Sequence, residues 1–167
     1  NLVSSCLSAN YFNDYDEVLV TTLEHHANLV PWHLVSKKIK IVSANINSTG
    51  ELDYDDLIEK INSRTKLIAI THMSNVTGSI TKIEKFKHKI KKLNIPILID
   101  GCQYVPHKSL NIKELDPDFY VFSAHKLYGP SGLGVLYMKD NWMDRLDPYQ
   151  GGGSMIKNVE VDISTYI

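Results

Sequence analysis

Short apolar runs of strand length alternate with amphipathic segments of helix length along this chain. Strand-like runs occupy 17–23, 39–42, 66–71, 95–99, 119–123 and 134–138. They are rich in β-branched and aromatic residues, which favour strands. Continuous apolar runs of this length indicate strands that are buried on both faces, as in a parallel sheet. We therefore predict a three-layer α/β/α fold around a mostly parallel sheet.

Helices are predicted between these runs, over 26–38, 53–61 and 81–93. In the first, apolar residues recur at spacings of three and four, at Leu29, Trp32, Val35 and Ile39. In the third, we expect an inward face made of Ile83, Phe86, Ile90 and Leu93. Its outer face carries six lysines, at positions 82, 85, 87, 89, 91 and 92, which we interpret as a solvated helix surface.

Composition argues against several classes of protein. The chain has 167 residues, which is one domain by length, and a formal net charge of −1. It offers no overall attraction to nucleic acid or to an anionic membrane, and no apolar run approaches the ~20 residues of a membrane span. The only cysteines are Cys6 and Cys102, which argues against a disulfide framework and is compatible with a reducing compartment.

Polar and titratable residues follow four of the predicted strands directly. In chain order they are Glu24, His25 and His26; His72, Ser74 and Asn75; Asp100 and Gln103; and Ser123, His125 and Lys126. The carboxyl ends of parallel strands lie at one edge of a sheet, which is where open α/β sheets bind ligands. We therefore expect these side chains to form one site.

The residue types at this edge suit an aldehyde cofactor that contains a pyridine ring. A partly buried lysine such as Lys126 is a good nucleophile toward an aldehyde and forms a Schiff base. Asp100 could keep a ring nitrogen protonated, His25 could stack on the ring, and Gln103 could bond a ring oxygen. Ser123 and His125 could donate hydrogen bonds to a phosphate. Each residue alone also has a structural explanation, as a turn, capping or surface residue.

Five stretches together resemble the cysteine desulfurases, which are class V enzymes of the fold-type I pyridoxal-phosphate (PLP) group. They are EHHANLVPW at 24–32, THMSNVTGS at 71–79, DGCQ at 100–103, FYVFSAHKLYGPSGLGVLY at 119–137 and GGGSMI at 151–156. The similarity is greatest to the Suf-type group, which also contains selenocysteine-lyase-like members. The resemblance implies a PLP-transferase large-domain fold.

The resemblance also implies a role for each candidate residue. Lys126 matches the lysine that binds the cofactor and moves protons at the substrate α-carbon, and His25 matches the ring-stacking histidine, a candidate acid or base. Asp100 matches the partner of the pyridine nitrogen. The remaining cofactor contacts would be Gln103 and Asn75 near the ring hydroxyl, with Ser123 and His125 at the phosphate. No metal is implied.

Several features depart from the family pattern. Position 102 is cysteine where the family usually has a small residue without a thiol, and we expect Cys102, like Cys6, to be a buried structural thiol. The family's nucleophilic cysteine and its carboxylate-binding arginine would lie beyond Ile167, and its phosphate-binding turn before Asn1. We expect residues 1–167 to be the central part of the PLP-binding large domain, without the N-terminal phosphate loop and the C-terminal small domain.

For the complete protein, the resemblance implies conversion of L-cysteine to L-alanine with formation of a protein persulfide. That sulfur would pass to an acceptor protein for iron–sulfur cluster assembly. A homodimer is implied, with Gly151–Ser154 near the subunit interface and Thr165 near the partner's cofactor phosphate. We expect a cytoplasmic protein without nucleic-acid or membrane partners. Open alternatives are a selenocysteine lyase, another class V aminotransferase, and a non-catalytic fragment.

Overall fold

A six-stranded sheet forms the centre of the protein. The structure is a computed structural model that describes residues 1–35, 38–161 and 163–166. The strand order is β2-β1-β3-β4-β5-β6, and the bounds are Ile39–Ala44, Asp16–Thr21, Thr65–Thr71, Ile97–Asp100, Phe119–Ser123 and Gly134–Met138. The first five strands are parallel, and β6 runs antiparallel to β5. The predicted mostly parallel sheet is confirmed.

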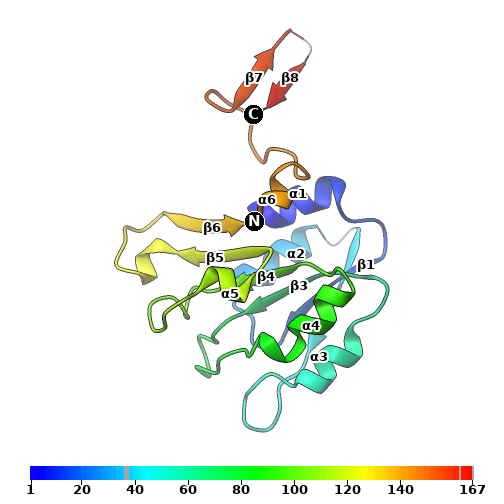
Figure 1. Ribbon diagram of the computed structural model, residues 1–167, viewed down its shortest axis with the longest axis vertical. Coiled ribbons are helices and arrows are strands. Elements are labelled where there is room, and N and C mark those ends of the chain that lie inside the picture. The colour runs from blue at the N-terminus through cyan, green and yellow to red at the C-terminus, as the bar shows by residue number, and fades with distance from the viewer. Residues whose placement is uncertain (36–37, 162, 167) are drawn as a thin grey trace.

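Helices cover both faces of this sheet (Figure 1). One face carries α1 (Leu2–Asn10), α2 (Val30–Leu34) and α6 (Asp140–Met143), and the other carries α3 (Tyr54–Lys60), α4 (Glu84–Lys92) and α5 (Ile112–Leu115). Two 3-10 turns, η1 (His26–Asn28) and η2 (Ala124–Lys126), follow β1 and β5. A small hairpin of β7 (Ile156–Val159) and β8 (Ser164–Tyr166) stands away from the sheet (Figure 1).

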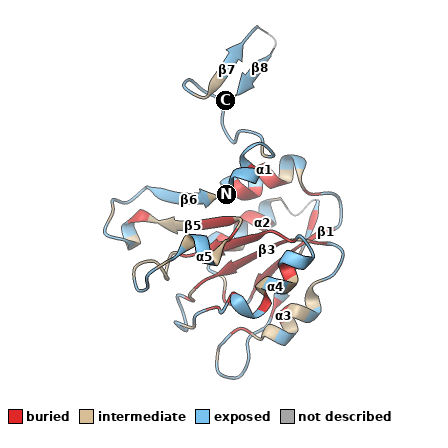
Figure 2. Ribbon diagram, viewed as in Figure 1, coloured by how far each residue is buried: buried red, intermediate tan, exposed pale blue. Residues whose placement is uncertain are grey.

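The two hydrophobic cores follow from the alternation of side chains along each strand. In β1, Leu19 packs into the core under α3 and α4, whereas Val18 and Val20 pack into the core under α1, α2 and α6. The central strands are buried and the edge strand β6 is largely exposed (Figure 2). The carboxyl edge therefore belongs to a sheet that helices cover on both faces. None of the described helices is both long and apolar enough to cross a bilayer.

The predicted helix over 26–38 is interrupted in the structure. The chain forms η1, then starts α2 at Val30 with Pro31 in its first turn. Proline has no N–H to donate, so it begins a helix more readily than it continues one. Residues 36 and 37 of the predicted helix lie outside the described residues.

The predicted helix over 81–93 begins later than expected, at Glu84. Ile83, Phe86 and Ile90 are buried as predicted, but the expected burial of Leu93 is wrong, because Leu93 follows the last helical residue and is 50% exposed. Several lysines of this helix fold back onto the protein rather than extending into solvent. Their Nζ atoms reach the carbonyl of Glu114 (Lys87), the carbonyl of Ile58 (Lys89), the ring of Tyr54 (Lys85) and the carboxylate of Asp116 (Lys91).

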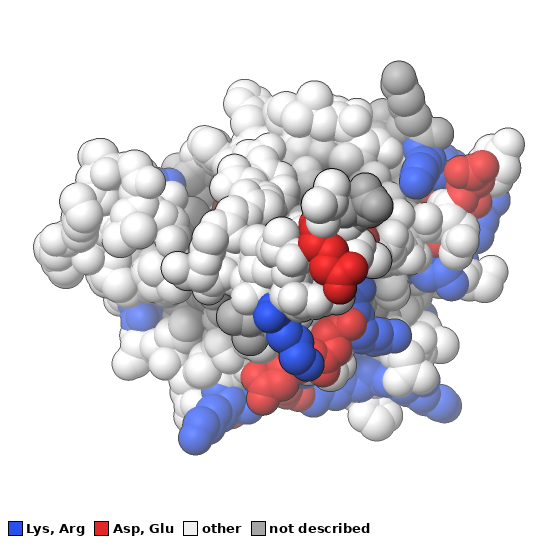
Figure 3. All heavy atoms as spheres, turned by 90° about the horizontal axis from the view of Figure 1, so that it is seen from above, with Lys and Arg blue, Asp and Glu red and all other residues white. Residues whose placement is uncertain are grey.

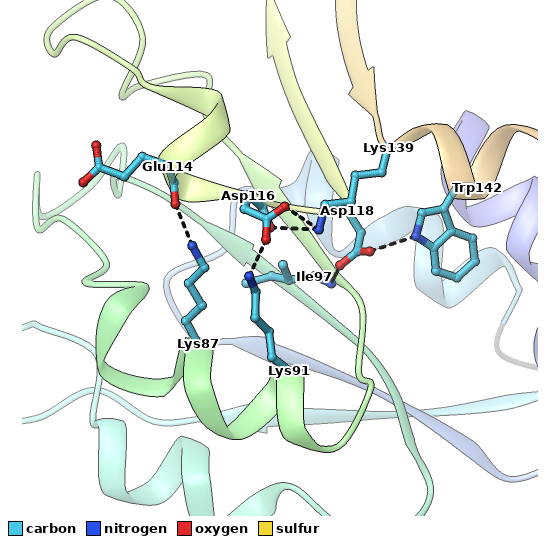
Figure 4. A network of polar contacts seen from close by, with 8 residues as sticks. All are labelled: Lys87, Lys91, Ile97, Glu114, Asp116, Asp118, Lys139 and Trp142. Carbon is cyan, nitrogen blue, oxygen red and sulfur yellow. Dashed lines mark hydrogen bonds and ion pairs between the residues drawn. The ribbon is translucent and has the colours of Figure 1, made fainter.

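Charges of both signs lie close together on the face shown in Figure 3, where blue and red atoms adjoin. Figure 4 shows a network of this kind at the amino ends of β4 and β5. Asp116 pairs there with Lys91 and Lys139, while Asp118 accepts from the backbone N–H of Ile97 and from Nε1 of Trp142. These contacts join α4, α6 and two strands, which indicates a structural role.

Candidate functional site

A cavity of about 290 Å³ lies at the carboxyl edge of the sheet. Seven of the eleven strand-end residues that the sequence grouped line it: His25, Asn75, Asp100, Gln103, Ser123, His125 and Lys126. They come from the segments after β1, β3, β4 and β5. The structure therefore brings these seven residues together, whereas Glu24, His26, His72 and Ser74 do not line the cavity. The roles of the seven residues remain predictions.

The order of the strands explains why a cavity forms at this place. From β1 the chain passes to β2 on one side and then to β3 on the other side of β1. The connections that leave β1 and β3 therefore diverge, and a crevice opens beyond their carboxyl ends. Both Thr71, the last residue of β3, and His25, after β1, line the cavity.

The backbone after β5 fixes the position of Lys126, which is half-buried. The carbonyl of Ala124 accepts from the N–H groups of Leu127 and Gly129, at 2.8 and 2.9 Å. A Cβ on Gly129 would lie 2.9 Å from the Cβ of Ala124 and 3.0 Å from its carbonyl oxygen. The tight turn therefore requires glycine, and it holds the lysine at the rim of the cavity.

Asp100 ends β4 and is only 6% exposed. Its Oδ1 accepts from the backbone N–H of Cys102 at 2.9 Å. Gly101 follows directly and lies against Tyr120, since a Cβ at this position would come within 2.2 Å of the tyrosine ring. The glycine thus lets the chain turn over Tyr120 so that Asp100 and Cys102 both reach the cavity.

His25 is exposed and is the N-cap residue of η1. Its Nδ1 accepts from the backbone N–H of Ala27 at 3.1 Å, so the neutral ring carries its proton on Nε2, as assigned from this hydrogen bond. The Nε2–H edge is therefore the one free to face a ligand. The neighbouring His26 does not line the cavity.

Glu24 lies just behind His25 and was noted in the sequence without a role. Its carboxylate accepts from the hydroxyl of Thr21, the backbone N–H of Thr71 and the side-chain amide of Asn28. Burial raises the pKa of Glu24 to about 7, although these hydrogen bonds act in the opposite direction, and the charge of Asp100 adds to the rise.

His72 does not line the cavity, although it follows β3 directly. It is buried against Tyr104, with ring centroids 3.6 Å apart, and burial lowers the pKa of its imidazole to about 4. The sequence grouped His72 and Ser74 with the strand-end residues. They belong to the packing beneath the edge and not to the lining of the cavity.

The lining also contains residues that the sequence did not nominate: Ala27, Thr71, Met73 and Cys102. Thr71 was detectable as the last residue of a predicted strand. The expected burial is confirmed for Cys6 but wrong for Cys102, which is half-buried with its Sγ 3.8 Å from Oγ of Ser123. Burial and the charge of Asp100 both raise the pKa of the Cys102 thiol, in that order of size.

A larger cavity, of about 420 Å³, lies at the opposite edge of the sheet. It is lined by residues of the Asp116 and Asp118 network, including Lys87, Lys91 and Lys139. These charged groups already have partners within the protein: Lys91 and Lys139 pair with Asp116, Asp118 accepts from Trp142, and Lys87 donates to the carbonyl of Glu114 (Figure 4). The convergence of a lysine, a carboxylate and an imidazole at the smaller cavity makes it the better candidate site.

Comparison with known proteins gives a consistent result. The family model described as Aminotransferase class-V matches residues 1–166. A protein named cysteine desulfurase from Wigglesworthia glossinidia brevipalpis is 43% identical over 162 residues, which is 95% of this chain and 40% of that protein. A cysteine desulfurase from Yersinia pseudotuberculosis is 39% identical over 99% of this chain and 41% of its own length.

A solved structure supports the same relationship. The crystal structure of the cysteine desulfurase CsdA from Escherichia coli has a TM-score of 0.92 and 36% identity, and the match covers 99% of this chain and 43% of that one. This chain thus spans about two fifths of the length of these relatives.

Proposed function

Because this chain belongs to the class-V aminotransferase family, we propose that its complete protein is a PLP-dependent cysteine desulfurase. The observation that carries the proposal is the meeting of Lys126, Asp100 and His25 at one cavity. The names of the relatives support the choice of activity within the family. The nearer kinship with the Suf-type group stays a prediction.

The residues of the cavity fit PLP by their chemistry. The cofactor carries an aldehyde, a pyridine nitrogen, a ring hydroxyl and a phosphate, and the lining offers a partner for each. We assign Lys126 to the aldehyde, Asp100 to the nitrogen, Gln103 and Asn75 to the ring hydroxyl, and Ser123 and His125 to the phosphate. When bound, PLP supplies an electron sink for a carbanion at the substrate α-carbon.

The protein's own residues would then act as follows. The Lys126 amine would bind the cofactor and carry a proton to and from the substrate α-carbon. The Asp100 carboxylate would hold a proton on the ring nitrogen by charge attraction, in a setting that excludes most water. The imidazole of His25 would cover one face of the cofactor ring and orient that ring. The hydrogen bond from the N–H of Ala27 to Nδ1 fixes the edge of the imidazole itself.

The sulfur-transfer step needs a thiolate, and neither cysteine of this chain suits the role. Cys6 is buried on α1 and does not line the cavity. Cys102 lines it, but its raised pKa keeps it a thiol. We therefore propose that the nucleophile is supplied by a part of the protein outside residues 1–167, and that these residues are the central part of the large domain.

The proposed reaction implies a substrate, a product and an acceptor protein. L-cysteine is the substrate, L-alanine leaves, and the persulfide passes to a sulfur-acceptor protein that serves iron–sulfur cluster assembly. The complete protein would be a homodimer, with the loop at 151–154 near its interface. Two free cysteines in the described residues agree with a reducing, cytoplasmic location.

One assay separates this function from its alternatives. The complete protein, loaded with PLP, is given L-cysteine, L-selenocysteine, or an amino acid with a keto-acid acceptor. We expect equal amounts of alanine and sulfide from L-cysteine in the presence of a reductant. Turnover of selenocysteine alone would indicate a lyase of that type, and amino transfer to the keto acid an aminotransferase. No reaction with any of them would support a non-catalytic role.

A further inference from the structure

Glu24 occupies the point where the strand order reverses. We propose that Glu24 is a positioning residue for His25, and that its carboxylate ties the turn carrying this histidine to β3. The inference deepens the proposed function and rests on it for the meaning of the His25 position. The tie itself is a property of this chain and is testable without a cofactor.

Three donors from three different segments converge on this one carboxylate. Oε1 accepts from the hydroxyl of Thr21 at 2.6 Å and from the backbone N–H of Thr71 at 2.9 Å. Oε2 accepts from the side-chain amide of Asn28 at 2.6 Å. These donors lie at the end of β1, the end of β3 and the end of η1. Hydrogen bonds to a charged acceptor are about twice as strong as neutral ones.

The tie is placed where it controls the orientation of His25. His25 follows Glu24 directly, and η1 spans the next three residues, from His26 to Asn28. Asn28 is fixed at its side chain by Glu24 and at its backbone by the carbonyl of His25, 2.9 Å away. With Ala27 bonded to Nδ1, both the main chain and the ring of His25 are fixed relative to β3. Without the carboxylate, this turn would be joined to β3 much more weakly.

The environment of Glu24 makes the tie dependent on pH. Asp100 on β4 is the charged neighbour whose field acts on Glu24, and Thr21, Asn28 and Thr71 face it with neutral donors. The acid form of Glu24 carries a proton on one oxygen, so that oxygen can no longer accept from every donor present. The tie should therefore strengthen as pH rises through about 7 and weaken as pH falls through it.

A second glutamate, Glu17 on β1, provides a control at the other end of the strand that precedes Glu24. Glu17 stands at the amino end of β1, where it accepts from Asn62 at 2.7 Å and pairs with Arg64 at 3.1 Å. Glu17 is buried, and it lies at the opposite edge of the sheet from the cavity. Glu17→Gln therefore reports a general loss of stability without any direct effect on His25.

The experiment compares Glu24→Gln, Glu17→Gln and the double variant Glu24→Gln/Asn28→Asp with the wild-type complete protein. Hydrogen exchange, read by mass spectrometry on peptides covering 21–30 and 67–74, measures the tie in the absence of PLP. Modification of His25 by diethyl pyrocarbonate, with His26 as the internal reference, measures the exposure of the ring. Both are followed from pH 6 to pH 8, with exchange corrected for its intrinsic pH dependence.

We expect Glu24→Gln to speed exchange in both peptides by about tenfold or more at pH 8, the loss of one charged hydrogen bond. The His25 rate should change several-fold relative to His26, and the wild-type step near pH 7 should vanish. The double variant restores a donor–acceptor pair between positions 24 and 28 and should recover most of the protection. Glu17→Gln should keep the step.

Two results would overturn the inference: wild-type exchange and His25 reactivity in Glu24→Gln, or the same changes in Glu17→Gln. PLP titration of the same proteins, by visible absorbance, then separates the two proposals. A loss of the tie together with weaker PLP binding in Glu24→Gln supports both. A wild-type protein that fails to bind PLP, yet shows the expected exchange pattern, refutes the proposed function and leaves the role of Glu24 in holding His25 standing.

Discussion

Nδ1 of His72 lies 3.0 Å from the hydroxyl oxygen of Tyr120, and this contact joins the end of β3 to β5 across β4. The His72 ring stacks on Tyr104, and its backbone N–H donates to the carbonyl of Asp100 at 2.8 Å. The cluster lies directly beneath the edge that carries the candidate site, so its packing supports the position of Asp100.

This burial predicts a dependence of stability on pH. The pKa of His72 is about 4 in the folded protein and 6.5 in the reference state, so the unfolded chain binds more protons between these values. The contribution to stability is complete above pH 6.5 and is lost as pH falls toward 4, by about 3 kcal/mol at most. Urea unfolding of wild type and His72→Gln between pH 4.5 and 7.5 should show a shallower acid slope in the variant. Equal slopes would contradict the assignment.

Asp118 should contribute to stability without affecting the site. Asp118→Ala removes the acceptor for the backbone N–H of Ile97 and for Nε1 of Trp142, leaving two donors in partly buried positions. Such a loss costs about 2–3 kcal/mol of unfolding free energy. Asp144→Ala, at an exposed position of the same region, should change stability by about 0.5 kcal/mol or less. A fall in PLP affinity for Asp118→Ala would argue that the two edges are coupled.

Gly101 should tolerate no side chain. A methyl group there would overlap the Tyr120 ring, so the backbone next to Asp100 would have to move. We expect Gly101→Ala to lower the unfolding free energy by about 2 kcal/mol, a typical cost of overpacking, and to weaken PLP binding. Gly152→Ala is the control, because nothing lies within 4 Å of a Cβ at that position. Tyr120→Leu in the Gly101→Ala background should recover part of the loss.

Lys126 is expected to be the covalent attachment point of PLP. The complete wild-type protein should hold a visible chromophore that borohydride fixes to the peptide containing Lys126. Lys126→Ala should lose this attachment and lower turnover by about a thousandfold or more. Lys108→Ala, an exposed lysine outside the cavity, should retain both properties. A borohydride-fixed cofactor in Lys126→Ala would show that another amine holds it.

Asp100 is expected to act on catalysis more than on binding. Asp100→Asn keeps the shape of the side chain and its acceptor for the Cys102 N–H, but it removes the negative charge. We expect PLP to bind with modest loss, while desulfurase turnover falls about a hundredfold or more, as when one preorganised electrostatic partner is removed. Parallel measurement of PLP affinity and of alanine release makes the distinction. Wild-type turnover would refute the charge-stabilising role.

The sequence predicted the sheet and the location of the site more successfully than the helices around them. Short apolar runs indicate strands. The observed strands Ile97–Asp100 and Phe119–Ser123 lie within or beside the predicted ranges. The prediction of one helix over 26–38 is wrong in its middle. The same apolar spacing is also satisfied by the 3-10 turn η1 and the short helix α2, which are separated at Leu29. Local periodicity does not distinguish these cases.

The sequence by itself determined which residues stand at the ends of strands, and hence that a lysine, a carboxylate and histidines share one edge. That follows from the chain's local pattern, because parallel strands place their carboxyl ends together. Only the tertiary structure decided that β1 lies between β2 and β3, that Glu24 bonds to Thr71, and that Tyr120 fills the space under Gly101. These contacts join residues 19 to 47 positions apart in the chain, and their free energy depends on packing and burial that no local segment specifies.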